Sequence, residues 1–472
     1  MTPKRILVFA VGPVGASGFG FISLLVIAWY FPQEDIGRFS LLQAVLGLAA
    51  IVASLGLDQS YVRCFHDVED KATLLIPTFL PGLLAVLALS AAIWLRREDV
   101  SAWLFGTEPG ILIWVLVIGL LLAFLRRLLS LILRMKERGI AFSISQVLPH
   151  LVFAGALLLI IFAGLEKTFL GLALAYLGSI LCATLSCIWL VRSDLLSGLR
   201  AKGGARQLKQ MLRFGLPLAA GSLAFWILTA MDKVFLRELA DFNALGLYQI
   251  AVSVAAPAAV IQQIFSIVWA PIVYKWASAD HAVENVPAVS RYVLALVVLG
   301  FTLVGSISWV LTYFLPSEYS GIQWLIVSCV GFPLFYTLSE STVVGIGISK
   351  RSEFGFLAAA LALAVNFLAN LWLVPNFQAA GAAVSTCIAF FVFFVLRTEF
   401  SIFLWRPMPR LLMYTTTSIC VAAATATTLY GEVFGGWVFG LWSTLLIGAV
   451  FLFRAELLTA LSFCRQRVTA TN

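Results

Sequence analysis

Residues 214–250 read FGLPLAAGSLAFWILTAMDKVFLRELADFNALGLYQI and decide the fold of this chain. The stretch begins with an apolar segment long enough to cross a membrane, which contains the pair Asp232-Lys233 near its end. A short polar turn follows, and Gly246-Leu247-Tyr248 starts a second apolar segment. The beginning of the chain has the same plan, since Pro13 lies in a Gly-rich apolar segment and Gly37-Arg38-Phe39 precedes the next one. Two copies of one unit indicate an internal duplication, which in membrane proteins is typical of transporters.

The composition excludes a soluble domain. Of the 472 residues, 61% are hydrophobic and 11% are charged, and apolar stretches of membrane-spanning length recur along the whole chain. Helices satisfy their own backbone hydrogen bonds inside lipid, so each stretch is predicted to be a transmembrane helix. The fourteen predicted spans are roughly 6–30, 40–57, 73–95, 111–133, 142–164, 168–191, 214–236, 246–273, 291–315, 322–348, 354–374, 379–400, 410–430 and 434–454.

The duplication predicts two halves in parallel orientation. Pro13 matches Pro217 at an offset of 204 residues, and Gly171 matches Gly381 at 210, so the register drifts little. Each half holds six spans, an even number, so both halves have the same orientation in the bilayer and a cavity lies between them. We therefore predict an all-α integral membrane protein of about 14 transmembrane helices, with two parallel six-helix repeats around a central cavity and two further C-terminal helices.

Four parts of the chain follow from this duplication. The second part of the linker is predicted to form a basic amphipathic helix on the inner membrane surface. The predicted parts are an N-terminal six-helix lobe at 1–192, a cytoplasmic linker at 193–213, a C-terminal six-helix lobe at 214–404, and two extra transmembrane helices with a cytoplasmic tail at 405–472.

The distribution of positive charge predicts the orientation. With the N-terminus inside, 23 of the 31 Lys and Arg residues fall on the inner side and 6 on the outer side, so both termini are predicted to be cytoplasmic. The net charge of +8 then reflects topology and anionic lipid, and no nucleic-acid partner is expected. The first span reads as a permanent helix and not as a cleaved signal peptide. The seven cysteines show no metal-ligand spacing, and no metal or cofactor is expected.

Several short motifs together resemble one family of transporters. The resemblance covers about residues 6–400, and its specificity comes from the order and spacing of motifs that are weak individually. In the second half the motifs are Gly215-Leu216-Pro217-Leu218, Asp232-Lys233, Gly246-x-Tyr248, Pro271, Asn366-x3-Asn370 before Pro375, and Gly381-Ala382-Ala383. In the first half they are Phe31-Pro32-x-Glu34-Asp35-x-Gly37-x-Phe39-Ser40 and Leu55-Gly56-Leu57 before Arg63. These motifs resemble the Wzx-type polysaccharide flippases of the multidrug/oligosaccharidyl-lipid/polysaccharide (MOP) exporter superfamily.

The resemblance implies a transporter and not an enzyme. A protein of this family is expected to flip an undecaprenyl-pyrophosphate-linked oligosaccharide, such as an O-antigen unit, from the cytoplasmic to the periplasmic leaflet of the bacterial inner membrane. Alternating access coupled to an H+ or Na+ gradient is the expected mechanism. The expected partners are the lipid-linked substrate, membrane lipids and the coupling ion, and a glycan polymerase and a chain-length regulator are candidate protein partners.

Three charged residues within predicted spans are candidates for the transport path, because charge inside a membrane is expensive. Arg126 and Arg127 lie in the fourth span and Glu340 in the tenth. The repeat offset of 214 pairs Arg126 with Glu340, so the two are predicted to face each other across the cavity, with Glu340 as the ion-coupling acid. Alternatively, Arg126 extends to the inner surface and Glu340 is a hydrogen-bonded packing residue. Arg127 points about 100° away from Arg126 on a helix.

Other polar residues in the spans are weaker candidates. His150 could pass protons or bind pyrophosphate, or could be a neutral ring bonded between helices. Asp232 and Lys233 are predicted to lie toward the outer edge of the membrane. One interpretation is that Asp232 is an ion-coupling acid and Lys233 a cation of the cavity; the other is that they form a simple interfacial ion pair. Asn366 and Asn370 share one helix face and suggest a wet, sugar-binding cavity, although interhelical hydrogen bonds also explain them. Helix bends that would help a rocking motion are predicted at Pro13, Pro217, Pro257 and Pro333.

Four other classes of protein remain as alternatives. A multidrug or small-molecule cation antiporter of the same superfamily usually has twelve spans and an acid-rich first lobe, whereas the first three spans here contain no buried carboxylate. A peptidoglycan lipid-precursor flippase has fourteen spans but is marked by arginines in the first ones, and 6–30 contains none. A major-facilitator carrier is disfavoured because loop 58–72 lacks that family's motif. A membrane glycan polymerase or ligase would need a large outer loop, and the longest one is about 96–110.

Overall fold

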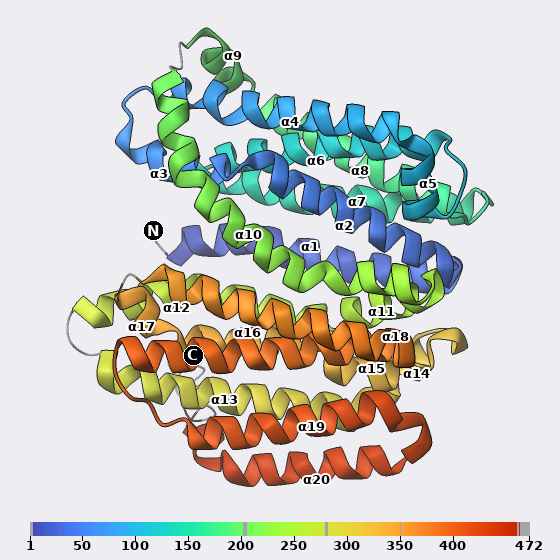
Figure 1. Cartoon of the computed structure of the whole chain (residues 1–472), viewed down its shortest axis with the longest axis vertical. Helices are drawn as coiled ribbons and strands as arrows, with labels where there is room; N and C mark the ends of the chain where they lie inside the picture. The colour runs from blue at the N-terminus through green and yellow to red at the C-terminus, as the bar shows by residue number, and fades with distance from the viewer. Residues whose placement is uncertain (1–2, 202–204, 279–281, 350, 460–461, 463–472) are drawn as a thin grey trace, which may run out of the picture. The chain divides into compact units, whose positions relative to one another are not determined.

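The computed structural model describes residues 3–201, 205–278, 282–349, 351–459 and 462. In these residues the chain is almost entirely helical and contains no strand (Figure 1). The chain divides into two compact units. The first unit is Met1–Arg237 with Asp241–Gln249, and the second is Glu238–Ala240 with Ile250–Asn472. The prediction of an all-α membrane protein is confirmed.

The first unit contains α1 to α10 and the beginning of α11. Within it α6 packs against α2, α4 and α8, and α7 packs against α1 and α8. Its helices are α1 (Pro3–Tyr30), α2 (Gln33–Ser54), α3 (Leu57–Asp67), η1 (Lys71–Leu74), α4 (Leu75–Leu95), α5 (Arg97–Phe105), α6 (Ile111–Met135), α7 (Gly139–Phe162), α8 (Phe169–Leu190), α9 (Arg192–Arg200), α10 (Ala205–Leu239) and α11 (Phe242–Val254).

The second unit is built around α16 and α13. α16 packs against α12, α13 and α18, and α13 also packs against α20. Its helices are α12 (Ala256–Ser278), α13 (Ala282–Ile307), η2 (Ser308–Val310), α14 (Leu311–Phe314), η3 (Ser317–Tyr319), α15 (Ile322–Cys329), α16 (Gly331–Thr342), α17 (Val344–Ile348), α18 (Ser352–Leu404), α19 (Leu411–Phe434) and α20 (Trp437–Leu452).

The helices are compatible with the fourteen predicted spans. Among the described residues, ten helices are each long and apolar enough to cross a membrane, and α11 with the first part of α12 forms a further, bent span. The shorter apolar segments Gly15–Tyr30 and Trp437–Leu452 fall on the first and last predicted spans. The chain is therefore a multi-pass membrane protein.

Helix α18 contains two spans. Its backbone leaves the helical region at Gln378, with φ 46° and ψ −121°. The Nδ2 atom of Asn366 lies 3.4 Å from Oγ1 of Thr386, and a Cβ added to Gly381 would lie 2.3 Å from the carbonyl oxygen of Leu373. Residues so far apart along one straight helix could not meet, so the chain reverses at Gln378 into an antiparallel hairpin. The two arms correspond to the predicted spans 354–374 and 379–400.

The compact units do not divide where the predicted lobes do. Helix α10 belongs to the first unit, although the second lobe is predicted to begin at residue 214. The linker 193–213 contains most of α9 and the first turns of α10, which continue directly into the span; residues 202–204 lie outside the described part. The pair of six-helix lobes in parallel orientation remains our proposal for how the duplication is organised.

Two helices begin earlier than the hydropathy pattern predicts. Helix α2 begins at Gln33, after Pro32 and with Glu34 and Asp35 in its first turn, which suits a helix start. Helix α11 likewise begins at Phe242, four residues before Gly246. The Gly-x-aromatic motif of each repeat therefore lies just inside a helix and not in the loop before it.

These two motifs pack against each other reciprocally. A Cβ added to Gly37 would lie 2.0 Å from the carbonyl oxygen of Phe242, four residues before Gly246. A Cβ added to Gly246 would lie 2.1 Å from the carbonyl oxygen of Gln33, four residues before Gly37. The Nε2 atom of Gln33 donates to the Asn243 carbonyl at 2.9 Å. The backbones of α2 and α11 touch at both glycines, as a duplicated pair related by a local two-fold axis would.

A second close contact holds α10 in the first unit. A Cβ added to Gly56 would lie 2.0 Å from the carbonyl oxygen of Gly215, and one added to Gly215 would lie 2.6 Å from the carbonyl oxygen of Gly56. The hydroxyl of Ser60 donates to the carbonyl oxygen of Met211 at 2.6 Å. The glycine of the Gly215-Leu216-Pro217 motif is thus needed for helix contact.

The four prolines at which bends are predicted lie at different places in the helices. A bend of 49° separates α11 from α12, and Pro257 is the second residue of α12. Pro217 lies inside α10, and Pro333 follows the interruption between α15 and α16. Pro13 lies within α1, but its side chain is outside the described part. A role for these bends in a rocking motion stays a prediction.

We predict that Gly37→Ala or Gly246→Ala destabilises the protein strongly. Each added methyl group must displace a backbone carbonyl, so a loss of about 1–3 kcal/mol or more is expected. Thermal unfolding and the monodisperse fraction of the purified protein would measure it. Gly178→Ala in α8 is the matched control, because a Cβ there meets nothing within 4 Å. Unfolding temperatures equal to that control would contradict the proposed crossing.

Candidate functional site

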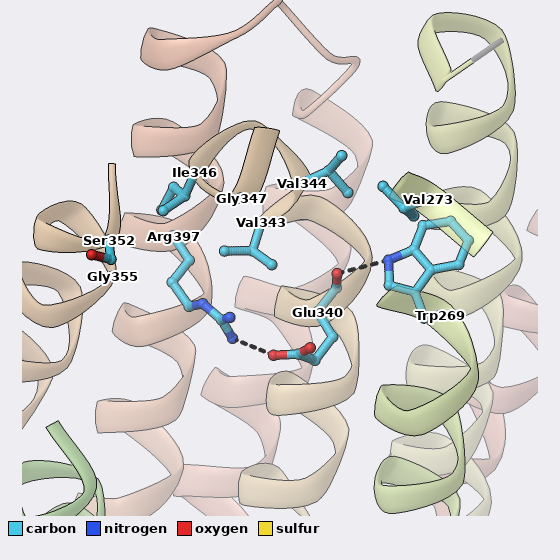
Figure 2. A pocket seen from close by; sticks show the side chains of 10 residues that line it. All are labelled: Trp269, Val273, Glu340, Val343, Val344, Ile346, Gly347, Ser352, Gly355 and Arg397. Carbon is cyan, nitrogen blue, oxygen red and sulfur yellow. Dashed lines mark hydrogen bonds and ion pairs between the residues drawn. The ribbon is translucent and has the colours of Figure 1, made fainter. Parts of the chain in front are cut away.

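The best-defined polar site in the described part of the second unit is an ion pair between two membrane-spanning helices (Figure 2). Nη1 of Arg397, on α18, lies 2.9 Å from Oε1 of Glu340, on α16. The two side chains are only 13% and 16% exposed, respectively. Charges this deeply placed are retained in membrane helices only when they are paired, and each residue here is the counter-ion of the other.

Aromatic and hydroxyl groups hold the arginine in place. Nη1 of Arg397 also donates to the hydroxyl of Ser339 at 2.7 Å. The guanidinium lies over the rings of Phe393 and Tyr336, at 4.9 Å and 5.5 Å from their centroids. Tyr336 additionally makes side-chain hydrogen bonds with Glu340 and Arg397. Cation–π contacts are strongest away from water, so they fix the guanidinium beside the carboxylate.

A polar seam between α16 and α18 explains why these side chains meet. The hydroxyls of Thr342 and Thr398 are hydrogen bonded at 2.7 Å, and the amide of Gly345 donates to the hydroxyl of Ser401 at 2.8 Å. The backbone approaches closely here, since a Cβ added to Gly345 would lie 2.3 Å from the Ser401 carbonyl oxygen. Threonine and serine at helical spacing thereby set the register that places Arg397 against Glu340.

The ion pair borders a cavity of about 300 Å³. Figure 2 shows Glu340 between Arg397 and Trp269, whose Nε1 donates to the Glu340 backbone carbonyl at 2.9 Å. The first residues of α18 close the cavity on the arginine side. The lining residues are Trp269, Val273, Glu340, Val343, Val344, Ile346, Gly347, Ser352, Gly355 and Arg397. A titratable acid and a permanent cation therefore share one partly enclosed space.

Arg397 is the functional candidate that the sequence does not reveal. It falls near the end of the predicted span 379–400, where an arginine is easily taken for a charge of the following inner loop. The signal that could have found it is an arginine flanked by Phe393 and Phe394 on one side and Thr398 on the other, inside an otherwise apolar segment. The predicted partner of Glu340, Arg126, belongs to the first unit, and their facing each other stays a prediction.

Arg127 has a carboxylate partner in the first unit. Its Nη2 lies 2.7 Å from Oδ2 of Asp58, at the start of α3, and its Nε donates to the same oxygen at 3.2 Å. The side chain of Asp58 is 9% exposed, so a buried acid directly follows the second span. On the same short helix, burial and the negative charge of Asp194 raise the pKa of Tyr61 to about 12. Arg127 therefore has a structural role as the partner of Asp58. Its role in substrate binding stays a prediction.

Arg126, His150 and Tyr176 form an electrostatic cluster in the first unit. The positive charge of Arg126 acts on both His150 and Tyr176, which lie on α7 and α8. His150 is exposed, and its Nδ1 would lie 3.7 Å from a Cβ added to Gly20 of α1. Nε of Arg126 is buried without a hydrogen-bond partner among the described atoms. Arg126 and His150, predicted separately as substrate ligands, thus lie within electrostatic range of each other.

Asp232 is buried inside the first unit. Its side chain is fully buried, and its Oδ2 accepts a hydrogen bond from the hydroxyl of Tyr248 at 2.6 Å. Lys233, the next residue, is half-buried and within electrostatic range of Asp232. The tyrosine of the Gly246-x-Tyr248 motif therefore ties α11 to α10 through this acid. The predicted parts of Asp232 in ion coupling and of Lys233 in the cavity stay predictions.

Asn366 and Asn370 lie in the interior of the second unit. Both side chains are fully buried, and the Nδ2 of Asn370 donates to the backbone carbonyl of Asn366 at 3.0 Å and to its side-chain oxygen. Nδ2 of Asn366 lies 3.4 Å from the Thr386 hydroxyl on the other arm of α18. The contact with Thr386 joins the two arms, as the alternative of hydrogen bonds between helices predicts, and the pair does not line the cavity at Glu340. Contact with substrate stays a prediction.

Comparison with protein families gives one extensive match. The model of the family described as "Polysaccharide biosynthesis protein" matches residues 4–276, more than half of the chain. A curated relative from Haloferax volcanii, named "Probable low-salt glycan biosynthesis flippase Agl15", is 20% identical over 399 residues. The alignment covers 83% of this chain and 81% of the relative.

Comparison with solved structures identifies the fold. The lipid II flippase MurJ in an inward closed conformation is similar with a TM-score of 0.69 at 14% identity, covering 96% of this chain and 99% of that one. An inward-facing multidrug resistance transporter of the MATE family has a TM-score of 0.56 at 15% identity, covering 85% and 95%. Identities this low establish a shared fold alone, and the fold is that of the MOP superfamily.

We predict that Tyr248→Phe destabilises the protein by about 2 kcal/mol, because the fully buried Asp232 loses a hydrogen bond to a charged group. Thermal unfolding of the purified protein would measure the loss. Tyr30→Phe, which removes the hydroxyl of an exposed tyrosine, is the matched control and should unfold like the wild type. Equal stability of the two variants would show that the Tyr248–Asp232 bond contributes nothing.

Proposed function

The chain belongs to the polysaccharide biosynthesis protein family, and from this premise we propose that it flips a lipid-linked oligosaccharide across the membrane. The proposed cargo is an undecaprenyl-pyrophosphate-linked oligosaccharide, moved from the cytoplasmic to the periplasmic leaflet of the bacterial inner membrane by alternating access. Both termini are proposed to be cytoplasmic, in agreement with the 23 Lys and Arg residues on that side against 6 on the other. The protein acts as a transporter and not as an enzyme.

The observation on which this proposal rests most is the Glu340–Arg397 pair at a cavity between membrane-spanning helices. A gradient-driven transporter needs an acid that can gain and lose a proton or bind a cation inside the membrane, and Glu340 is such an acid. A cargo with a diphosphate needs a cation, and a guanidinium binds two phosphate oxygens at once. We propose that Glu340 couples transport to an H+ or Na+ gradient.

The cation-rich character of the described charges favours glycan flipping over the alternatives. A multidrug cation antiporter would need acids that bind a positively charged cargo, whereas Asp58 is already paired with Arg127 and Glu340 with Arg397. The Arg126 cluster in the first unit adds a further positive charge whose Nε has no described partner. The likeness to a lipid II flippase concerns the fold alone; the family match is what supports an oligosaccharide as the cargo.

We predict that Glu340→Ala and Arg126→Ala each reduce surface glycan display by on the order of tenfold or more, as when about 1.4 kcal/mol of stabilisation is lost. Display would be measured by glycan immunoblotting in a flippase-deleted strain, with the amount of protein in the membrane measured in parallel. Glu399→Gln is the matched control, because Glu399 pairs with Arg410 and is 40% exposed. Normal display with both alanine variants would remove these residues from the path.

We predict that purified protein in liposomes flips a fluorescent undecaprenyl-pyrophosphate oligosaccharide faster when a pH or sodium gradient is imposed. Glu340→Gln should make the rate independent of the gradient, because an amide neither titrates nor carries charge. A rate that ignores both gradients in the wild type would exclude Glu340 as a coupling acid. Gradient-driven transport of an organic cation without movement of the lipid would instead identify a multidrug antiporter.

A further inference from the structure

The cavity beside Glu340 is lined by a few polar groups and several aliphatic side chains. Its polar lining residues include Glu340, Arg397 and Ser352 (Figure 2). The aliphatic lining residues are Val273, Val343, Val344 and Ile346. At about 300 Å³ the cavity is at the lower end of the range for small-molecule sites. It therefore has room for one sugar ring and not for an oligosaccharide.

The ion pair keeps hydrogen-bonding capacity that sugar hydroxyls can use. The bonds from Arg397 to Glu340 and Ser339 both leave from Nη1. Tyr336 bonds to both members of the pair. A carboxylate accepts several hydrogen bonds and a guanidinium donates several, so both side chains can make more. Neighbouring hydroxyls of a sugar ring suit this arrangement, because one donates to Glu340 while the next accepts from Arg397 and the ion pair stays intact.

A neutral polyol also leaves the charge of the site unchanged. The side chains of Arg397 and Glu340 are 13% and 16% exposed, so their charges compensate each other away from bulk water. A hydroxyl adds a hydrogen bond to a charged group, which is stronger than a bond between two neutral groups. It brings no charge that needs a partner of its own. The aliphatic lining meanwhile suits the C–H groups of a sugar ring.

Two titratable or charged side chains contact Glu340 among the described residues. Tyr336 lies on the same helix and Arg397 on α18. Trp269 on α12 donates to the backbone carbonyl of Glu340. The other charged side chains described on the elements around it are exposed or paired, namely Lys275, Arg291 with Glu456, Arg351 with Glu353, and Glu399 with Arg410. The charge state of Glu340 is therefore set beside Arg397 and Tyr336.

We propose that this cavity is a subsite for one neutral sugar ring of the cargo, and that the ionised carboxylate of Glu340 selects the sugar by accepting hydrogen bonds from its hydroxyls. The inference rests on the proposed function, which supplies a glycan. Protonation of Glu340 removes the charge that strengthens these bonds, so a proton and the sugar disfavour each other at one residue. Such exclusion suits the exchange of an outgoing cargo for an incoming proton, which is the direction of the proposed transport.

The test measures binding of methyl glycosides to the full-length protein in phosphatidylcholine nanodiscs by saturation-transfer NMR, because sugar-based detergents would compete. The probes are the methyl glycosides of glucose, N-acetylglucosamine, galactose and mannose. At least one is expected to bind more tightly than its uronic acid counterpart, which brings a second negative charge beside Glu340. The expected difference is about tenfold, equivalent to about 1.4 kcal/mol. Binding by none of the four, or tighter binding of the uronic acids, would overturn the proposal.

The pH dependence identifies the carboxylate. Wild-type protein should bind the glycoside more tightly at mildly alkaline than at mildly acidic pH, because ionised Glu340 is the better acceptor. Glu340→Gln keeps an oxygen acceptor without the charge, so it should bind about tenfold more weakly and equally at both pH values. A pH dependence that persists in Glu340→Gln, or undiminished binding by it, would contradict the role of this carboxylate.

A second variant tests the cavity without changing the ion pair. Gly355 lines the cavity, and a Cβ added there meets nothing within 4 Å, so the side chain in Gly355→Leu has room to fill the space. This variant should lose glycoside binding while unfolding at the same temperature as the wild type. Gly448→Leu on α20 is the matched control, because a Cβ there also meets nothing within 4 Å, and it should bind normally. Normal binding by Gly355→Leu would place the glycoside elsewhere and overturn the subsite.

The two proposals can fail separately. If the glycosides bind in this pattern but liposomes show no flipping of the lipid-linked oligosaccharide, the proposed function is wrong and the sugar subsite stands. If flipping holds while none of the glycosides binds, the function stands and this subsite is wrong.

Discussion

The contact between two helix backbones at Gly37 and Gly246 is the constraint on which the first unit depends. Each glycine faces a carbonyl oxygen four residues before the other, at a distance where any side chain would collide. Cation–π contacts stabilise the same region, since Cζ of Arg38 and Cζ of Arg237 lie 5.1 Å and 4.7 Å from the centroid of the Phe242 ring. A duplicated sequence can meet itself in this way because both copies carry a glycine at the same step. The Gly-x-aromatic motif of each repeat is therefore first a packing motif.

Three buried acids among the described residues, in both units, each have a polar partner. Asp58 holds Arg127, Tyr248 donates to Asp232, and Glu340 holds Arg397. Without such partners a charged side chain in a span would need water or a lipid headgroup. Of these three acids, only Glu340 lies against the described cavity at Arg397. Position beside this cavity distinguishes Glu340 from Asp58 and Asp232.

The sequence predicts what hydropathy and periodicity control and misses what depends on tertiary neighbours. The helical fold and its membrane spans follow from the length and polarity of the segments. The shared face of Asn366 and Asn370 follows from helical spacing, but their partner Thr386 depends on the chain reversal at Gln378. Arg397 escapes prediction because an arginine near a span end resembles a loop charge. The repeat offset aligns Arg126 with Glu340. The ion pair that Glu340 makes in the structure is with Arg397 on α18, and a repeat offset cannot predict such a contact.

A paired acid is better suited to coupling than a solitary one. A lone carboxylate in a span would be neutral most of the time, so its protonation would respond little to the proton concentration outside the membrane. Beside Arg397, gain of a proton by the carboxylate changes the charge balance around the guanidinium. That change can act on the cargo only if the cargo contacts the same ion pair. The cavity that Glu340 and Arg397 share places both events within one space, and coupling then needs no signal between distant sites.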